Sequence, residues 1–502
     1  MTSLSLFNSL TRTQEAFAPS DGKTARVYSC GPTVYNFAHL GNLRAYVFTD
    51  TLRRTLLFKG WEVRHVINIT DVGHLTSDAD AGEDKMELAA AGLGKDIWEV
   101  AAFYTTAFKT NLRDLNILDP SIWSVATDHI DEMIAFAARI ADRHCYEIES
   151  GLYFDVATVP DYGRLARSVS DEGESRIDPV SGKRNPQDFA IWRRSPPGEQ
   201  RQMEWDSPWG RGRPGWHLEC SAMSMKYLGE TLDLHCGGVD LIFPHHEDEI
   251  AQSEAATGKT FSRVWCHGEF LLTDGAKMAK RVGNVSTVKD LREQGVSAAA
   301  VRHFVFSTHY RKQLNMSGAA LEASMEAVRR VGEFAARLDE AAGGTPELAE
   351  AAEQAEAAVK AALFDDLNAP EAMGALFTFI TRGNTELDRR GTDVAAVERA
   401  RGAFALIDSV LDVRPRVARL TLQGDSAAWT SLGSNGTRPV DISSLPAEER
   451  DLLEWGAAQL RARQLARRAR QFAEADRIRG VLEERGFVVK DAPGAVVMER
   501  FS

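Results

Sequence analysis

Three separate segments carry the residue types that bind zinc in proteins. Cys30 ends an apolar run, Cys220 lies in GWHLECSAM, and His245 and Glu249 lie in FPHHEDEI. Pro244 suits the first turn of a helix, and a helix would place His245 and Glu249, four residues apart, on one face. Two thiolates, one imidazole and one carboxylate are ligands that zinc accepts. We therefore interpret these four residues as a candidate metal site.

The spacing leaves two alternatives open. His246 stands three residues before Glu249 and could take the place of His245 on the same helix face. Cys30 and Cys220 are also far apart in the sequence, so both could be core residues, with the histidines capping a helix. Spacing alone does not choose between these interpretations.

The segment His39-Leu40-Gly41-Asn42 stands between a turn-rich loop and a helix-forming run. The N-terminus of a helix presents unpaired N–H groups and positive potential, which attract phosphate. Gly41 permits a close approach of the backbone, and His39 and Asn42 can donate hydrogen bonds. The pattern predicts a phosphate site, with a simple helix cap as the alternative.

A basic segment, KMAKRVGN, begins at Lys277. It contains Lys277, Lys280 and Arg281 close to glycines, a pattern typical of a mobile basic loop. Such a loop can neutralise the charge that develops when a phosphorus atom is attacked. The alternative is a solvated charged turn.

A second basic stretch, residues 461–479, carries seven arginines against Glu474 and Asp476, a local charge of +5 (7 − 2) in a chain of net charge −13. Arginine suits phosphates and base edges, so this stretch predicts contact with a nucleic acid. A solvated helix face is the alternative. The acidic total argues weakly against such a partner, but net charge says little about a local patch.

The chain has 502 residues, of which 44% are hydrophobic and 26% charged, and it is long enough for several globular domains. Its five cysteines are too few for a disulfide framework. No apolar run reaches the ~18 residues of a membrane helix, and the first residues show no basic and apolar leader. We therefore expect a cytoplasmic protein without a membrane segment.

The elements that position these residues are those of an α/β fold. An apolar strand at 25–31 is followed by a turn-rich loop, a helix that ends at Gly60, and a second strand at 63–69. This order indicates a βαβ unit and so a parallel sheet, whose ligands bind at the carboxyl ends of the strands. Cys30 and Thr70 stand at two of those ends.

Later segments differ in character. Residues 120–215 are irregular and contain a stretch rich in Pro and Gly, which indicates an insertion between two halves of the sheet domain. Apolar residues from Leu321 to Leu338 recur at helical spacing and predict the first of several helices. The predicted parts are a first half of the sheet domain at 1–119, the insertion at 120–215, the second half at 216–312, a helical bundle at 313–412, a linker at 413–446 and a C-terminal helical region at 447–502 that carries the second basic stretch.

Taken together, these segments resemble the cysteinyl-tRNA synthetase family. In that family's order the chain contains YSCGPTVYNFAHLGN, INITD, GWHLECSAM, LHCGGVDLIFPHHEDEIAQSEA, KMAKRVGN and FAEADRIRGVLEERGFVV. The likeness covers residues 24–490 and is most specific at 215–254. It implies a Rossmann-like parallel-sheet catalytic domain with an insertion, an α-helical bundle and a small C-terminal anticodon-binding domain.

The resemblance also implies roles for single residues. His39 to Asn42 stands at the family's HIGH signature, and Lys277 to Arg281 stands at its KMSKS signature. The family's zinc ligands, for one ion per chain, match Cys30, Cys220, His245 and Glu249, which favours His245 over His246. The remaining assignments are Thr70, Trp216 and His235 in a cysteine pocket, and Gly237, Gly238 and Asp240 beside the adenosine.

The chain departs from the family signatures at three places. Asn42 replaces the last histidine of HIGH, Ala279 and Arg281 replace the serines of KMSKS, and Gly73-His74 stands where an acidic pair is common. Both lysines of KMSKS remain, so these departures bear on the rate more than on the reaction.

The function that the resemblance implies is that of a ligase. L-cysteine and ATP, with Mg²⁺, would give cysteinyl-adenylate and pyrophosphate, and the 3′ end of tRNA(Cys) would then take the cysteine. Zinc would select the substrate thiol, because the hydroxyl of serine is a much poorer ligand, and no separate editing domain would be needed. The chain is expected to act as a monomer.

Two alternatives remain at this point. A related ligase joins activated cysteine to an amino-sugar with the same zinc site and both signatures, but it needs no anticodon-binding tail such as residues 313–502 suggest. The other alternative is a zinc-stabilised nucleic-acid-binding protein without catalysis, and the lysines at 277 and 280 argue against it.

Overall fold

The computed structural model describes residues 3–72, 85–167, 180–196, 198, 201–273, 275–277, 286–415, 417–423, 426–433, 436–439, 442, 447–485, 487–492 and 495–501. Contacts within the chain divide it into two compact units. The first contains Met1–Val288, His309–Asn315 and Ala362–Asn368, and the second contains Lys289–Thr308, Met316–Ala361 and Ala369–Ser502.

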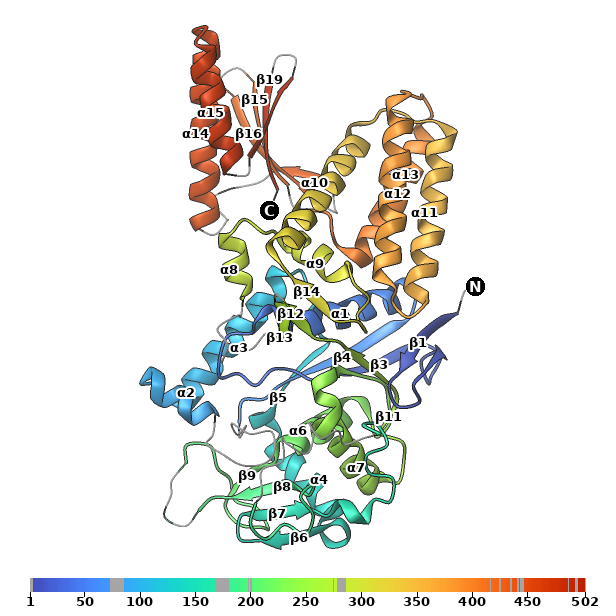
Figure 1. Ribbon diagram of the computed structural model, residues 1–502, viewed down its shortest axis with the longest axis vertical. Helices are drawn as coiled ribbons and strands as arrows, with labels where there is room; N and C mark the ends of the chain where they lie inside the picture. The colour runs from blue at the N-terminus through green and yellow to red at the C-terminus, as the bar shows by residue number, and fades with distance from the viewer. Residues whose placement is uncertain are drawn as a thin grey trace. The chain divides into compact units, whose positions relative to one another are not determined.

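A five-stranded sheet forms the centre of the first unit (Figure 1), in the order β11-β10-β3-β4-β5 with every neighbouring pair parallel. The chain adds β4 and β5 on one side of β3 and later adds β10 and β11 on the other side. Ligands of such sheets bind beyond the carboxyl end of the strand where the order reverses, which here is next to Cys30. The strands are β3 Thr24–Ser29, β4 Glu62–Ile69, β5 Ile122–Val125, β10 Leu232–Gly238 and β11 Ser262–Gly268.

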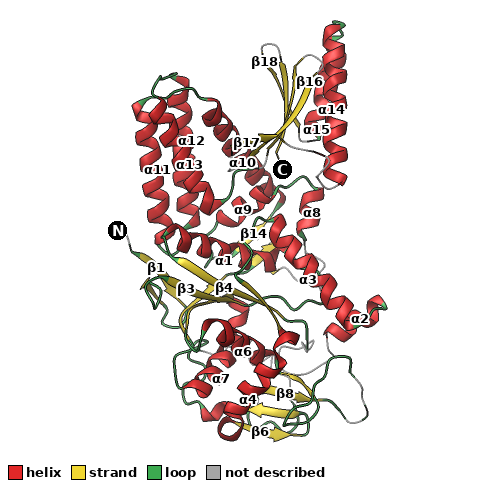
Figure 2. Ribbon diagram, turned by 180° about the vertical axis from the view of Figure 1, so that it is seen from behind, coloured by secondary structure: helices red, strands yellow, loops and turns green. Residues whose placement is uncertain are grey.

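Helices cover both faces of this sheet, with α1 on one face and α6 and α7 on the other (Figure 2). Because both faces are covered, the side chains of Val66, Ile67 and Ile69 in β4 are all buried. The prediction of a Rossmann-like parallel sheet is therefore confirmed. The covering helices are α1 Leu40–Phe58, α6 Trp216–Leu228 and α7 Glu247–Thr257, and two further helices, α2 Lys85–Leu93 and α3 Ile97–Asp114, follow β4 in the sequence.

The insertion into the sheet domain is a separate antiparallel layer. It begins with α4 Ile130–His144 and continues with a sheet in the order β6-β7-β8-β9. The predicted boundary at residue 120 differs from the structure, because β5 pairs with β4 in the parallel sheet. Four residues are too few to show the pattern of a buried strand, which explains the difference. The insertion strands are β6 Cys145–Ile148, β7 Gly151–Phe154, β8 Phe189–Arg194 and β9 Gly212–Pro214.

Two small sheets accompany the parallel sheet. The antiparallel strands β1 Leu4–Asn8 and β2 Thr13–Phe17 form one of them near the start of the chain. In the other, β12 Leu271–Thr273 lies between β13 Ala276–Lys277 and β14 Leu314–Met316. The second of these sheets carries the start of the basic segment.

Helices follow along the chain after residue 288. The apolar stripe predicted from Leu321 to Leu338 lies in α10, where Leu321, Val328, Phe334 and Leu338 are buried. The prediction of a helical bundle after the sheet domain is confirmed. The helices are α8 Val288–Glu293, α9 Ala298–Phe306, α10 Gly318–Glu340, α11 Pro346–Phe364, α12 Ala369–Asp388 and α13 Val394–Leu411.

The C-terminal part pairs two helices with a sheet in the order β17-β16-β15-β19-β18. The prediction of a linker at 413–446 is wrong for the described residues, because β15 to β17 lie there. The three strands pair antiparallel, and Leu420 and Leu422 of β15 alternate into the core against Leu453 and Leu460. The elements are β15 Val417–Gln423, β16 Ser426–Gly433, β17 Gly436–Pro439, α14 Ala447–Arg468, α15 Phe472–Glu484, β18 Phe487–Ala492 and β19 Ala495–Phe501.

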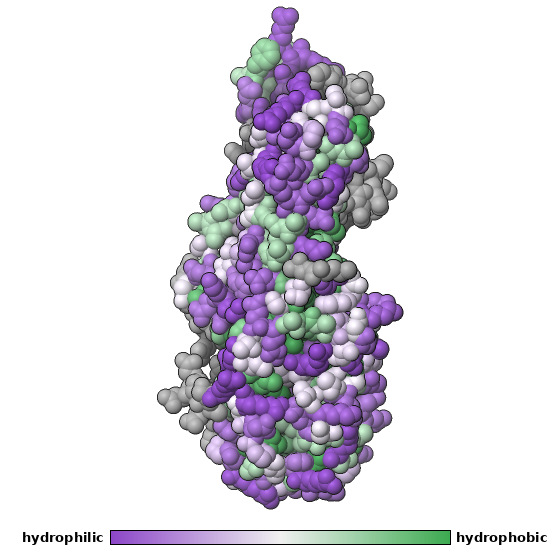
Figure 3. Space-filling model, turned by 90° about the vertical axis from the view of Figure 1, so that its right-hand side faces the viewer, coloured by the Kyte–Doolittle hydropathy of each residue, from purple (hydrophilic) through white to green (hydrophobic). Residues whose placement is uncertain are grey.

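The hydropathy of the surface is that of a chain whose apolar side chains are mostly buried. On the face seen in Figure 3, hydrophilic side chains cover most of the surface and hydrophobic ones are scattered among them. In the described parts of the chain, none of the helices combines the length and the apolar character that a membrane span requires.

Candidate active site and metal centre

The carboxyl end of β3 is the meeting point of four side chains from distant parts of the sequence. Cys30 follows β3, Cys220 lies in α6, His245 lies in the turn before α7, and Glu249 lies in the first turn of α7. Their ligand atoms all lie within 4.8 Å of one another. Cys220, His245 and Glu249 are at most 1% exposed, so the cluster is shielded from water.

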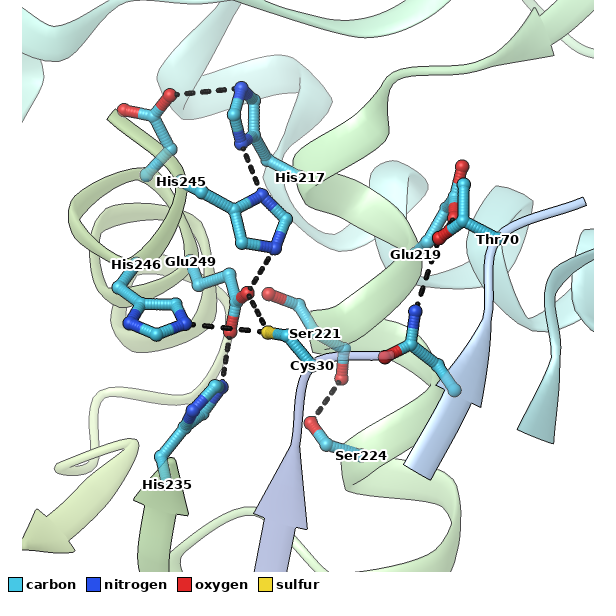
Figure 4. A network of polar contacts seen from close by, with 12 residues as sticks. Cys30, Thr70, His217, Glu219, Ser221, Ser224, His235, His245, His246 and Glu249 are labelled. Carbon is cyan, nitrogen blue, oxygen red and sulfur yellow. Dashed lines mark hydrogen bonds and ion pairs between the residues drawn. The ribbon is translucent and has the colours of Figure 1, made fainter. Parts of the chain in front are cut away.

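A second set of four overlaps the first. Cys30 and Glu249 also meet His235 and His246, with all ligand atoms again within 4.8 Å. Figure 4 shows His246 pointing to Cys30, with its Nε2 at 3.3 Å from Cys30 Sγ, and His235 pointing to Glu249, with its Nε2 at 2.7 Å from Glu249 Oε2. The positions of the ligand atoms therefore allow either His245 or His246 to bind a metal at this site.

The chemistry of the thiols favours the set with Cys220. Burial alone would raise the pKa of Cys220, but the hydrogen bond with Cys30 and the nearby His245 lower it to about 6. Burial and the neighbouring Cys220 raise the pKa of Cys30 well above its usual range. Two buried sulfurs with opposite pKa shifts, beside an imidazole and a carboxylate, offer the donors that a soft divalent cation prefers. The donor set fits zinc on this ground.

His245 is oriented by residues around the cluster. His245 Nε2 lies 2.8 Å from Glu249 Oε1, while its Nδ1 lies 2.9 Å from Nδ1 of His217. His217 Nε2 in turn lies 3.3 Å from Asp248 Oδ2. Such support holds a ligating imidazole in one rotamer and one tautomer. Trp216 adds a stacked ring, 4.2 Å from that of His245 between centroids.

The residues assigned to the cysteine pocket fall around this cluster. Trp216 and His235 contact His245 and Glu249, respectively. Thr70 is buried, and no bond drawn in Figure 4 joins it to the four candidate ligands. Its Oγ1 donates to Oε2 of Glu219, the residue before Cys220, at 2.9 Å. Burial raises the pKa of Glu219 well above its usual range. The role of these residues toward a substrate stays a prediction.

The sequence did not single out His217, Asp248 or Glu219. Asp248 and Glu219 stand directly beside Glu249 and Cys220, and His217 follows Trp216. Adjacency to a candidate site residue was the only signal, because the partner of each lies on another element.

The residues assigned to adenosine lie at the end of the neighbouring strand. Gly237 and Gly238 close β10, and Asp240 lies in the turn that follows. A Cβ at Gly237 would lie 2.7 Å from the His246 ring, and one at Gly238 would lie 2.3 Å from Asp240 Oδ1. The buried His246 ring leaves no room for a side chain at Gly237, and Gly238 lies against the side chain of Asp240.

The start of α1 is a reciprocal helix cap. The backbone N–H of Asn42 donates to His39 Nδ1 at 3.2 Å, and that of His39 donates to Asn42 Oδ1 at 3.2 Å. The cap that the sequence left as an alternative is thus present. Gly41 lies in the same first turn, where backbone N–H groups and the helix dipole favour an anion.

The basic segment is described only at its beginning. Lys277 pairs with Leu272 in the hairpin of β12 and β13, so its backbone is fixed by that strand pair. Lys280 and Arg281 lie outside the described residues.

Comparison with known proteins first gives the class. A family model described as the class I (C) tRNA synthetase catalytic domain matches residues 16–326, a DALR domain model matches 358–413, and a cysteinyl-tRNA ligase anticodon binding domain model matches 449–496. The fold resembles methionyl-tRNA synthetase of Mycobacterium tuberculosis in complex with methionyl-adenylate, with a TM-score of 0.58 and 16% identity over 78% of this chain and 92% of that one. These matches define a class I aminoacyl-tRNA synthetase.

The relatives narrow the class further. The cysteine–tRNA ligase of Novosphingobium aromaticivorans is 44% identical over 97% of this chain and 95% of its own length. The cysteine–tRNA ligase of Chlorobaculum tepidum is 41% identical over 98% of both chains. The chain belongs to the cysteine–tRNA ligase family.

The two overlapping ligand sets make different predictions for metal binding. We expect about one zinc per chain. Cys220→Ser and His245→Asn should lower the zinc affinity by more than ~10²-fold, because each removes a ligand rather than a supporting residue. His235→Asn and His246→Asn are the matched controls and should keep most of the metal. Elemental analysis after dialysis against a chelator provides the measurement, and the reverse order of losses would assign the metal to the set with His235 and His246.

Proposed function

We propose that this enzyme joins L-cysteine to tRNA(Cys) in two steps, with one zinc ion per chain selecting the amino acid. The observation that carries the proposal is the buried cluster of Cys30, Cys220, His245 and Glu249 beyond the carboxyl end of β3. Its place is where class I sheets bind their substrates, and its sulfur donors suit the one amino acid with a thiol. The family of the chain agrees with this assignment.

The selection of cysteine rests on the cluster and the residues around it. A zinc ion held by the four ligands would offer a soft site that prefers the thiolate of cysteine to the hydroxyl of serine. Trp216, stacked on His245, limits the space beside the ligands. Thr70 and His235 complete the pocket wall in this proposal. Discrimination of this kind removes the need for a separate hydrolytic step.

The first step is the formation of cysteinyl-adenylate. The N-terminus of α1, with His39, Gly41 and Asn42, holds the phosphates of ATP together with Mg²⁺, while Gly237, Gly238 and Asp240 receive the adenosine. A carboxylate oxygen of cysteine forms a bond to the α-phosphorus, and the bond from that phosphorus to the departing pyrophosphate breaks. Lys277 and Lys280 stabilise the negative charge that develops there.

The second step transfers the amino acid. A terminal ribose hydroxyl of the tRNA attacks the carbonyl carbon of the adenylate, and AMP leaves. Recognition of the tRNA falls to the C-terminal part of the second unit, which matches the anticodon-binding model over residues 449–496.

The arginines of that part have different surroundings. Hydrogen bonds from Arg463, itself only 3% exposed, and from Arg467 hold the pKa of Asp491 at about 2. Arg463 and Arg467 therefore both pair with Asp491 within the domain, and the basic patch is smaller than the sequence suggested. Arg468 and Arg470 are exposed at the end of α14, close in sequence to Phe472, which is 60% exposed. Arginine and an exposed ring suit the phosphates and bases of an RNA loop.

The molecule that accepts the activated cysteine distinguishes this proposal from its alternatives. Purified enzyme should catalyse ATP–pyrophosphate exchange that depends on L-cysteine, and serine should support it at least ~10²-fold less well. The activated cysteine should pass to tRNA(Cys) and not to an amino-sugar. Transfer to the amino-sugar would identify the related ligase instead. A protein that binds RNA but shows no exchange with any amino acid would be the non-catalytic alternative.

The basic segment has its own test. Lys280→Ala should lower the rate of cysteine-dependent exchange by roughly 10²–10³-fold, as for the loss of one pre-organised donor to a developing charge. The apparent affinity for cysteine should change little, because the lysine acts on phosphate. Lys289→Ala, a change of an exposed lysine in α8, is the control and should leave the rate unchanged. A loss confined to cysteine binding would contradict this role of Lys280.

The C-terminal arginines are tested by a double variant. Arg468→Ala with Arg470→Ala should raise the KM for tRNA by about tenfold and reduce the salt slope by ~1 per lost phosphate contact, while exchange stays unchanged. Arg477→Ala is the control, because Arg477 is exposed but paired with Glu474 at 2.7 Å. Equal charging by the double variant and the wild type would leave these arginines as a solvated helix end. Truncation is a poor substitute, since a cut at Pro446 would separate β15 from β19.

A further inference from the structure

A buried arginine of α1, Arg44, holds two other segments of the chain by their backbone carbonyls, residues 269–270 and Lys312. Arg44 lies in α1, two residues after Asn42, and only 3% of it is exposed. Its Nη1 donates to the carbonyl oxygen of Glu269 at 2.7 Å and also to that of Phe270. Its Nη2 donates to the carbonyl oxygen of Lys312 at 2.5 Å. One guanidinium therefore satisfies three backbone carbonyls from two segments.

Those two segments are themselves joined in one small sheet. Glu269 and Phe270 directly precede β12, and Lys312 stands just before β14. The N–H of Glu269 donates to the carbonyl oxygen of Tyr310 at 2.8 Å, and the N–H of Leu314 donates to that of Phe270 at 3.2 Å. Arg44 consequently holds the whole sheet of β12, β13 and β14, and not a single loop.

A second contact follows one helical turn later. The ring of Phe48 stacks on that of Tyr310, with centroids 4.4 Å apart and an angle of 8° between the planes. Near its start, α1 also donates from the N–H of Leu40 to the carbonyl oxygen of Ser286 at 2.8 Å. The helix thus contacts the chain both before and after the basic segment.

The guanidinium suits this position better than an ammonium group. Burial lowers the pKa of Arg44 to about 10, which leaves it protonated at neutral pH. Its donors lie on separate nitrogens in a rigid fork, so it reaches two segments at once. A lysine carries its three donors on one nitrogen and cannot span them in the same way.

We propose that Arg44 is a positioning residue for the adenylation step. It fixes the β12–β13 hairpin, and with it the backbone of Lys277, on the helix whose first turn carries His39 and Asn42. The phosphates of ATP would lie between these two groups, so the arginine sets the distance between donors that must act on the same substrate. This inference rests on the proposed function, and Arg44 itself touches no substrate.

The same helix offers a matched control. Arg53 also lies in α1, and its Nη1 donates to the carbonyl oxygens of Leu118, at 3.2 Å, and Asp119. These acceptors lie in the connection to β5, away from the basic segment in sequence. Variants of Arg53 remove the same kind of contact from the same helix without touching the β12–β13 hairpin.

The test compares Arg44→Lys and Arg44→Gln with Arg53→Lys and Arg53→Gln. The kcat of cysteine-dependent exchange should fall about 10²-fold in the Arg44 variants, the loss expected when reacting groups are misplaced by about 1 Å. The KM for cysteine and the zinc content should not change, because the metal cluster is untouched. Amide hydrogen exchange of residues 271–277 should become faster in the Arg44 variants only. The Arg53 variants should keep the kcat, even where their Tm falls as much.

Three outcomes would overturn the inference. Arg44 variants with the kcat of the wild type would show that the hairpin needs no such hold, and a loss of kcat shared by the Arg53 variants would show a general effect of stability. A rise in the KM for cysteine together with loss of zinc would move the effect to the metal cluster. Absence of exchange in the wild type, in contrast, would overturn the proposed function and the adenylation role with it.

Discussion

The fully buried carboxylate of Glu249 is the constraint on which the candidate site depends. A buried charge is costly unless partners surround it. Burial would raise the pKa of Glu249, yet His235 at 2.7 Å and His245 at 2.8 Å hold it at about 2. Cys30 Sγ lies 3.8 Å from Oε1, the oxygen that His245 also contacts. Because these partners come from β10, from the turn before α7 and from the end of β3, satisfying one charge fixes three elements against one another.

The first turn of α7 extends this constraint into the insertion. Three acidic residues follow one another there, where the helix dipole favours negative charge, and each points to a different neighbour. Glu247 accepts three backbone N–H groups, those of Gly163, Leu165 and Ala166, and Asp248 accepts from the hydroxyl of Tyr162 at 2.5 Å. The loop of the insertion is thereby tied to the helix that carries Glu249. The ligands and the layer beside them are held by one short run of carboxylates.

The sequence predicted the parts of this arrangement that follow from local pattern. The βαβ order places Cys30 at the end of a strand, and helical spacing places His245 near Glu249, as the structure has them. The choice between His245 and His246 did not follow, because both rings reach the cluster from one turn of chain. His217 could not be predicted either, since its partners are brought to it by packing between α6 and α7. The strands from β15 to β17 were missed because the Gly, Ser, Thr, Asn and Pro residues within 413–446 outweigh the short apolar alternation of Leu420 and Leu422.

The first turn of α1 shows why a helix cap and a phosphate site need not be rival interpretations. The N–H of Asn42 donates to His39 Nδ1, so the neutral imidazole must carry its proton on Nε2. The N–H of His39 donates to Asn42 Oδ1, which leaves the amide nitrogen of Asn42 as the donor end. The cap therefore fixes both side chains through their acceptor atoms and does not itself use their donors. An asparagine in place of a histidine keeps this property, because its acceptor and its donors lie on separate atoms.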